Sequence, residues 1–84
     1  MKQILPVVFP LNLGTAIYFN LISINDNLIN TCQFYYQMLD SNTLQISNGN
    51  LTMTGSEYIA YSTSPDSNMY AYNWGANKLG LTLV

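Results

Sequence analysis

The sequence predicts an α+β fold in two layers: an antiparallel β-meander of three to four strands followed by two short C-terminal helices. Between residues 14 and 53, apolar and polar side chains alternate with a period of two, which is typical of strands. Clusters of Asn, Asp and Ser separate these stretches, so consecutive strands are expected to pair as antiparallel neighbours. From residue 54 onward, helix start and stop signals replace the alternation. The length of 84 residues fits a single domain, 1–84.

Residues 1–13 are expected to form an extended N-terminal arm or an edge strand. The run from Gln3 to Phe9 is apolar and rich in β-formers, but Pro6 within it lacks a backbone donor. Such a strand belongs at the edge of its own sheet or on a neighbouring subunit, and the sequence leaves both options open.

Residues 14–53 are expected to form the meander. A first strand, Thr15 to Ile24, is apolar on both faces and ends at a turn over residues 25–27. The second, Leu28 to Leu39, alternates cleanly and is expected to face the helices with one set of side chains: Cys32, Phe34, Tyr36 and Met38. Gln33 and Gln37 then lie on the other face.

The last strand of the meander, 43–53, changes phase in its middle. Leu44 and Ile46 occupy even positions, whereas Leu51 and Met53 occupy odd ones. One extra residue near Gly49, a β-bulge, would bring them to the same face. The alternative is a two-residue hairpin turn at Asn48-Gly49. We favour the bulge, because it gives a strand that matches its neighbour in length.

Residues 54–81 are expected to be helical. Thr54 and Glu57 have the spacing of a capping box, in which each side chain binds the other residue's backbone N–H. A second helix is expected from Pro65 to Leu79, with Ser64 as its N-cap and Gly80 as its stop.

Composition favours a subunit of an assembly. Only 7% of the residues are charged, against about 25% in typical domains, so the polar surface must consist of uncharged side chains that are less costly to bury than ions. The expected partners are other proteins and copies of the same chain. The main contact residues are expected in the first strand and the N-terminal segment: Ile4, Leu5, Val7, Val8, Phe9, Ile17, Phe19 and Leu21. The alternative is a monomer with an uncharged surface.

Several function classes lack support in the sequence. There is no histidine, and the single cysteine, Cys32, lies in a predicted strand, so no catalytic residues, metal site or cofactor are expected. Two lysines do not make a phosphate-binding surface, which argues against nucleic acid as a partner. No run of about 20 apolar residues is present, so no membrane span is expected.

The whole chain resembles small uncharacterised virion structural proteins of tailed bacteriophages. The resemblance rests on the extended N-terminus, the meander, the segment from Gly49 to Tyr58, and the C-terminal positions Tyr70, Trp74, Ala76 and Leu79 to Leu81. It implies a non-enzymatic subunit in the virion, bound in a symmetric assembly as capsid decoration or as a tail or fibre attachment. The alternatives are a carbohydrate-binding module for host adsorption and a small host-directed inhibitor.

Overall fold

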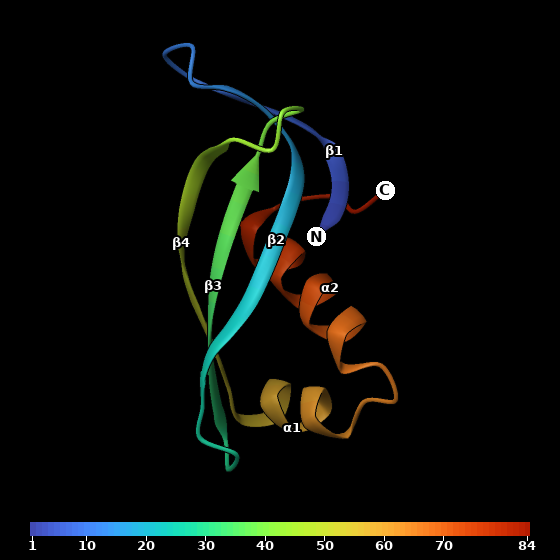
Figure 1. Cartoon of the computed structure of the whole chain (residues 1–84). Helices are drawn as coiled ribbons and strands as arrows, with labels where there is room; N and C mark the ends of the chain where they lie inside the picture. Colours follow the sequence, from blue (N-terminus) through green and yellow to red (C-terminus); the bar gives the residue numbers. More distant parts are fainter.

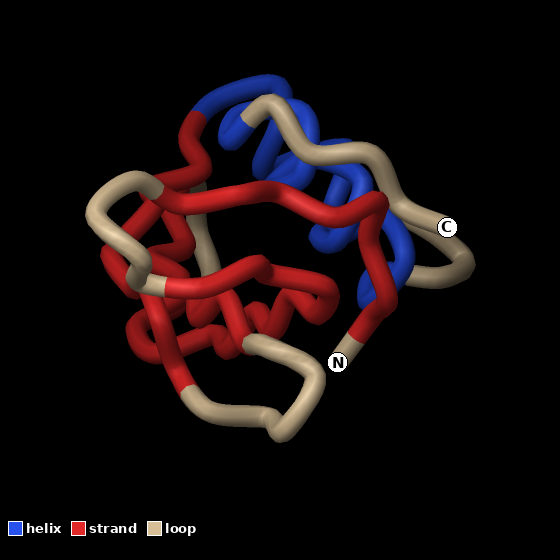
Figure 2. Tube along the Cα trace, turned by 90° about the horizontal axis from the view of Figure 1, so that it is seen from above, coloured by secondary structure: helices blue, strands red, loops and turns tan.

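The computed structural model describes all residues, 1–84, and contains an open four-stranded sheet with two helices packed on one face (Figures 1 and 2). The strands follow in the order β1-β2-β3-β4, and every neighbouring pair is antiparallel. This arrangement confirms the predicted α+β meander. The element bounds are β1 (Lys2–Phe9), β2 (Gly14–Asp26), β3 (Thr31–Leu39), β4 (Gln45–Thr54), α1 (Gly55–Thr63) and α2 (Ser67–Leu79).

The edge strand β1 packs on its own domain. Its register with β2 shifts between Gln3 and Val7, around Pro6. The C-terminal tail lies along its outer side, where Leu5 N–H donates to Thr82 O at 2.9 Å and Val84 N–H donates to Gln3 O at 3.0 Å. Of the two alternatives for the N-terminal segment, an extended arm or an edge strand, the structure has the edge strand.

The first turn of the meander differs from the prediction. β2 continues to Asp26, so the turn covers residues 27–30 instead of 25–27. The Asn27 side chain selects this position, because its Oδ1 accepts from three backbone N–H groups at 2.9–3.0 Å, those of Ile29, Asn30 and Thr31. Leu28 and Ile29, which were expected to begin a strand, lie at the tip of the turn.

The bulge in β4 occurs, but at a different residue. Met38 pairs with Ser47 while Leu39 pairs with Gln45, which makes Ile46 the extra residue. Neither the bulge at Gly49 nor the alternative turn there is correct. Gly49 is a regular strand residue opposite Tyr36, and a Cβ at this position would lie 2.7 Å from Tyr36 Oη. The glycine makes room for the tyrosine ring.

The helix starts also differ from the prediction in their capping. α1 begins where expected, but the Thr54 side chain makes no capping hydrogen bond. Glu57 instead accepts from Trp74 Nε1 at 2.9 Å, so the predicted capping box is wrong. The N-cap of α2 is Asp66, which accepts from Met69 N at 3.0 Å, and not Ser64. Gly80 ends α2 in the left-handed conformation, as expected.

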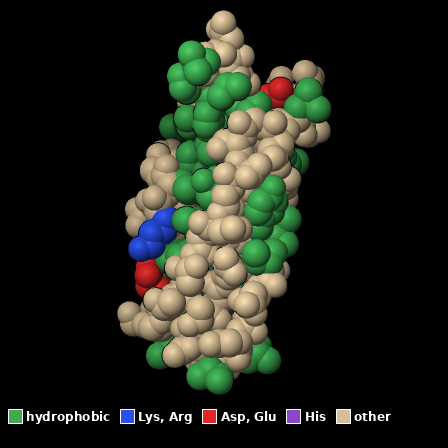
Figure 3. Space-filling view, turned by 90° about the vertical axis from the view of Figure 1, so that its left-hand side faces the viewer, with side chains coloured by type: hydrophobic (Ala, Val, Ile, Leu, Met, Phe, Trp, Pro, Cys, Tyr) green, Lys and Arg blue, Asp and Glu red, His purple; other side chains and the backbone are tan.

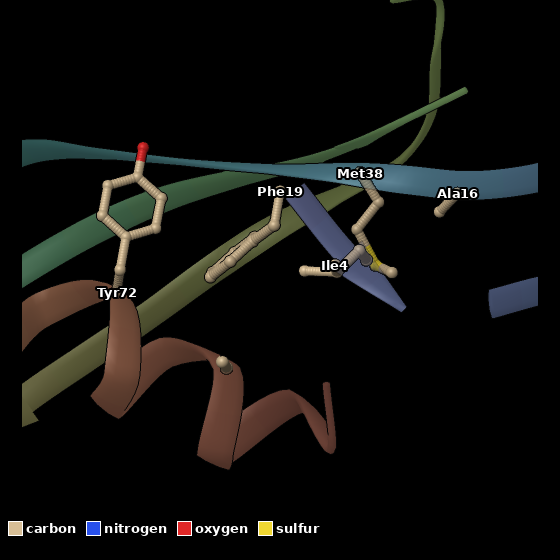
Figure 4. Packing of buried hydrophobic residues seen from close by; sticks show 6 residues of the cluster. Ile4, Ala16, Phe19, Met38 and Tyr72 are labelled. Atoms are coloured by element: carbon tan, nitrogen blue, oxygen red, sulfur yellow. The ribbon is translucent and has the colours of Figure 1, made fainter. Parts of the chain in front are cut away.

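The core lies between the sheet and the helices in two clusters. The first is shown in Figure 4 and contains Ile4, Ala16, Phe19, Met38, Tyr72 and Ala76. The second, nearer α1, contains Cys32, Phe34, Met53, Tyr58, Ala71 and Trp74. Cys32, Phe34 and Met38 of β3 are buried and Tyr36 packs against the first cluster, which confirms the predicted core face of this strand.

Substituting Gly49 with alanine tests the contact with Tyr36. We expect Gly49→Ala to lower the free energy of unfolding by about 1 kcal/mol, because the added methyl displaces the ring. In a Tyr36→Leu background the same change should be neutral or slightly stabilising, since an alanine also restricts the unfolded chain. Urea unfolding of the four proteins measures this coupling. Equal losses in both backgrounds would show that Tyr36 is not the reason for the glycine.

Candidate functional site

Most of the contact residues predicted from the sequence serve the domain itself. Ile4 is 1% exposed and Phe19 is fully buried, so the prediction that these two contact other chains is wrong. Three more pack against the first core cluster, namely Val7, Phe9 and Leu21. Ile17 is half-buried, and only Leu5 and Val8 are exposed. Phe19 and Leu21 lie on the helix side of β2, next to Gly75 of α2, whereas Ile22 and Ile24 are exposed.

The two most exposed apolar side chains, Leu11 and Leu28, lie instead at opposite ends of an elongated molecule of 41 × 21 × 18 Å, and Figure 3 shows apolar side chains at both ends. At one end is the turn between β2 and β3, residues 27–30, here called the hairpin tip (Figure 1). It presents Leu28, which is 81% exposed, and Ile29, which is almost as open. Leu28 has a φ of +62°, in the left-handed region.

The hairpin tip is held by hydrogen bonds on both sides of Leu28. Asp26 Oδ1 accepts from Leu28 N–H at 2.8 Å and from the Tyr58 hydroxyl at 2.7 Å. Tyr58 belongs to α1, so the tip is fixed to the helical layer. The hydrogen bond to the Asp26 carboxylate, assisted by burial, raises the pKa of Tyr58 to about 12. The two apolar side chains therefore stand on a pre-organised turn.

The second apolar group, here called the opposite end, comes from the β1–β2 and β3–β4 loops and consists of Leu11, Leu13 and Leu44. Leu11 is 90% exposed and has a φ of +59°. Leu44 is positioned much as Leu28 is, because Asp40 Oδ1 accepts from its N–H at 3.0 Å and from Asn42 N–H at 2.9 Å. Both ends therefore use an aspartate to fix a loop that carries an exposed leucine.

The left-handed leucines are costly for an isolated domain. The left-handed conformation costs an L-residue with a Cβ roughly 1–2 kcal/mol, and glycine or asparagine avoids much of this cost. Leu11 and Leu28 adopt it while burying almost none of their side chains. Neither the backbone preference of leucine nor packing within the domain accounts for leucine at these positions.

The sheet face turned away from the helices carries an uncharged polar row beside the exposed Ile22 and Ile24. Asn20 Nδ2 donates to Gln37 Oε1 at 3.0 Å, and Gln37 Nε2 donates to Gln45 Oε1 at 2.7 Å. The Tyr35 hydroxyl donates to the same Gln45 oxygen at 3.2 Å. These bonds link three strands in one row of oriented amides.

Other features of the chain that bear on chemistry are few. Cys32 is buried, and burial raises the pKa of its thiol. No group of three or more His, Cys, Asp or Glu side chains is arranged to hold a metal ion, and no pocket is present. Neither helix has the length and apolar character needed to span a membrane.

Sequence reasoning missed both ends. Leu28 and Ile29 were assigned to a strand, and Leu11 to the extended N-terminal segment 1–13. One signal was available: Asp26, Asn27 and Asn30 flank the Leu28-Ile29 pair in the sequence. Asn and Asp side chains bind nearby backbone N–H groups and so favour turns, which indicates a turn that includes the pair. Nothing in the sequence indicated that leucine itself takes the left-handed position.

Alkaline unfolding tests the attachment of the hairpin tip to α1. The pKa of Tyr58 is about 12 in the folded protein, against 10.0 without the fold. Its contribution to stability is therefore complete below pH 10 and is lost as the pH rises from about 10 to about 12. We expect Tyr58→Phe to be less stable than the wild type at neutral pH, and this difference to shrink across that window. Melting temperatures against pH measure it. Tyr70→Phe, at a hydroxyl without a hydrogen bond, should run parallel to the wild type.

Comparison with known proteins adds no relative. No protein-family model matches this chain, and no curated protein or solved structure matches it either.

Proposed function

We propose that this protein is a non-enzymatic structural subunit that attaches to its neighbours in an assembly through the hairpin tip and the opposite end. The observation that carries the proposal is the pair of exposed leucines in the left-handed conformation, Leu11 and Leu28. Their cost to the isolated domain is offset once their side chains are buried against another chain.

Two further features support contact through these ends. The hairpin tip and the β3–β4 loop are fixed by Asp26, Asn27 and Asp40, so little conformational entropy remains to be lost there on binding. The carboxylates near the ends already accept hydrogen bonds within the domain, and the exposed side chains beside them are uncharged. Burying such a surface strips water mainly from apolar groups, which is favourable.

The setting we propose for the assembly is a tailed-phage virion, because of the resemblance described above. The partners would be other virion proteins and copies of this chain, and the location would be capsid decoration or a tail or fibre attachment. A subunit with one apolar group at each end can contact neighbours on both sides, as rings and filaments require.

A second candidate function, glycan binding during host adsorption, is favoured by the row of amides on the open sheet face. Asn20, Gln37, Gln45 and Tyr35 hold each other in fixed orientations, and oriented amides next to an aromatic ring suit sugar hydroxyls. A glycan array separates this candidate from the first. Binding that is lost in Gln37→Ala but kept in Leu28→Asn would support the sugar site.

Leu28→Asn and Leu11→Asn test the structural role. Asparagine tolerates the left-handed conformation, so each variant should raise the stability of the monomer by about 1 kcal/mol. Each should also weaken self-association at the end that it changes, which sedimentation velocity measures. Leu28→Gly should behave in the same way.

Ile29→Asn is the matched control at the hairpin tip. Ile29 is exposed but not in the left-handed region, so this variant should weaken association at the hairpin tip without gaining stability. Ile59→Asn, on the surface of α1, should keep association. If both left-handed leucines can be replaced while association remains at the wild-type level, the ends are not the contact surfaces.

A further inference from the structure

The two edges of the sheet are treated differently. β1 carries Pro6 and an irregular register, and the C-terminal tail covers its outer side, with a bridge between Ile4 and Leu83. Proline, irregular pairing and a covering segment are the usual means by which a protein prevents another strand from adding to an edge. This edge is closed.

The other edge, β4, has no such protection. It lies at the far side of the sheet from β1, with no strand or tail along its outer side (Figure 1). Its ten residues, Gln45–Thr54, include no lysine, no other charged side chain and no proline. Its only irregularity, the bulge at Ile46, is near its start and leaves residues 47–54 regular. A long uncharged edge of this kind is unusual in a protein that remains single.

The register identifies the free backbone groups of β4. Gly55 N–H donates to Asn30 O just beyond the Thr31–Thr54 pair. Hydrogen-bonded pairs alternate in antiparallel sheets, so the odd-numbered residues 47–53 bond to β3. The N–H and C=O groups of Asn48, Asn50 and Thr52 therefore point outward, and the side chains of these three residues are exposed.

We propose that β4 pairs antiparallel with β4 of a second copy of this chain, around a twofold axis at Asn50. An antiparallel edge is complementary to itself, because a twofold rotation places each outward donor opposite an acceptor. In this register Asn50 is opposite Asn50 of the second copy, and Asn48 is opposite its Thr52. The two four-stranded sheets then form one continuous sheet with the helices of both copies on the same face.

Charge favours a second copy over another occupant. The whole edge is neutral, so two copies meet without like charges opposite each other, a situation that would be destabilising in a sheet. A basic or an acidic partner would find no opposite charge along it. The pairing is independent of the proposed role of the two ends, which involves other residues.

A charge swap at Asn50 tests the pairing. We use a background with Leu11→Asn and Leu28→Asn, so that contacts through the ends do not contribute. The background protein should sediment as a dimer at tens of micromolar. Asn50→Lys and Asn50→Asp should each be monomeric, because two like charges then meet at the axis, and an equimolar mixture of the two should restore a dimer. Gln33→Lys, on the open face but on the inner strand β3, should remain dimeric.

A disulfide trap gives a second readout that does not depend on affinity. Opposed residues of a hydrogen-bonded pair have Cα atoms about 5.5 Å apart, within disulfide reach. Asn50→Cys should therefore form a covalent dimer on mild oxidation, whereas Asn48→Cys should not, because its counterpart is Thr52. A background protein that is monomeric at this concentration, or a dimer unaffected by both charges at Asn50, would overturn the proposal. So would trapping by Asn48→Cys in preference to Asn50→Cys.

Discussion

The close approach of α2 to β2 at Gly75 and Phe19 determines much of this structure. A Cβ at residue 75 would lie 3.0 Å from Phe19 Cζ, so an alanine there would force the Phe19 ring or the helix to shift. One turn earlier, the Tyr72 hydroxyl accepts the Leu21 N–H at 3.1 Å and donates to Asn20 Oδ1 at 3.1 Å. A helix residue thus takes the place of a neighbouring strand beyond Phe19, the point at which the pairing with β1 stops. The chain leaving α2 then lies beside β1, which is why the C-terminal tail can close that edge.

The sequence predicted the core face of β3 but not that of β2, and the difference is physical. In β3 the apolar set alternates with Gln33 and Gln37, so the hydrophobic effect has only one favourable orientation. In β2, both faces carry large apolar side chains: Phe19 and Leu21 on one, Ile22 and Ile24 on the other. The hydrophobic effect alone therefore does not decide which set faces the core. The packing of Phe19 against Gly75 and Tyr72 decides the orientation of the strand. The Phe19 and Tyr72 rings meet edge to face, with their centroids 5.5 Å apart. That is a contact between residues more than fifty positions apart, and local pattern does not contain it.

The capping and turn predictions failed for a related reason. Thr54 and Glu57 satisfy the local rule for a capping box, but the indole N–H of the buried Trp74 needs an acceptor and takes Glu57. Lys78 adds to the preference for that orientation, with Nζ 3.7 Å from the same carboxylate oxygen. In the β2–β3 turn several Asn and Asp residues were available, and three backbone hydrogen bonds to Asn27 select the turn that forms. Local sequence signals predicted that a turn or a helix start occurs, to within a few residues. Which side chains cap it, and at which residue the turn forms, depends on the hydrogen-bond partners that the folded chain supplies.

The scarcity of charge has a structural consequence that links the two proposed kinds of contact. Each of the six charged side chains already has a partner inside the domain: Lys2 lies over the Tyr72 ring, Lys78 pairs with Glu57, Glu57 also binds Trp74, and Asp26, Asp40 and Asp66 cap loops or a helix. The surface that remains for other chains is therefore neutral, at the leucine-bearing ends and along β4 alike. The ends lie along the long axis of the molecule, whereas β4 faces sideways (Figure 1). Contacts through the ends would extend an assembly in one direction, and pairing through β4 would join it across that direction. A small subunit with uncharged contact surfaces can therefore be held by neighbours on three sides without burying an unpaired charge.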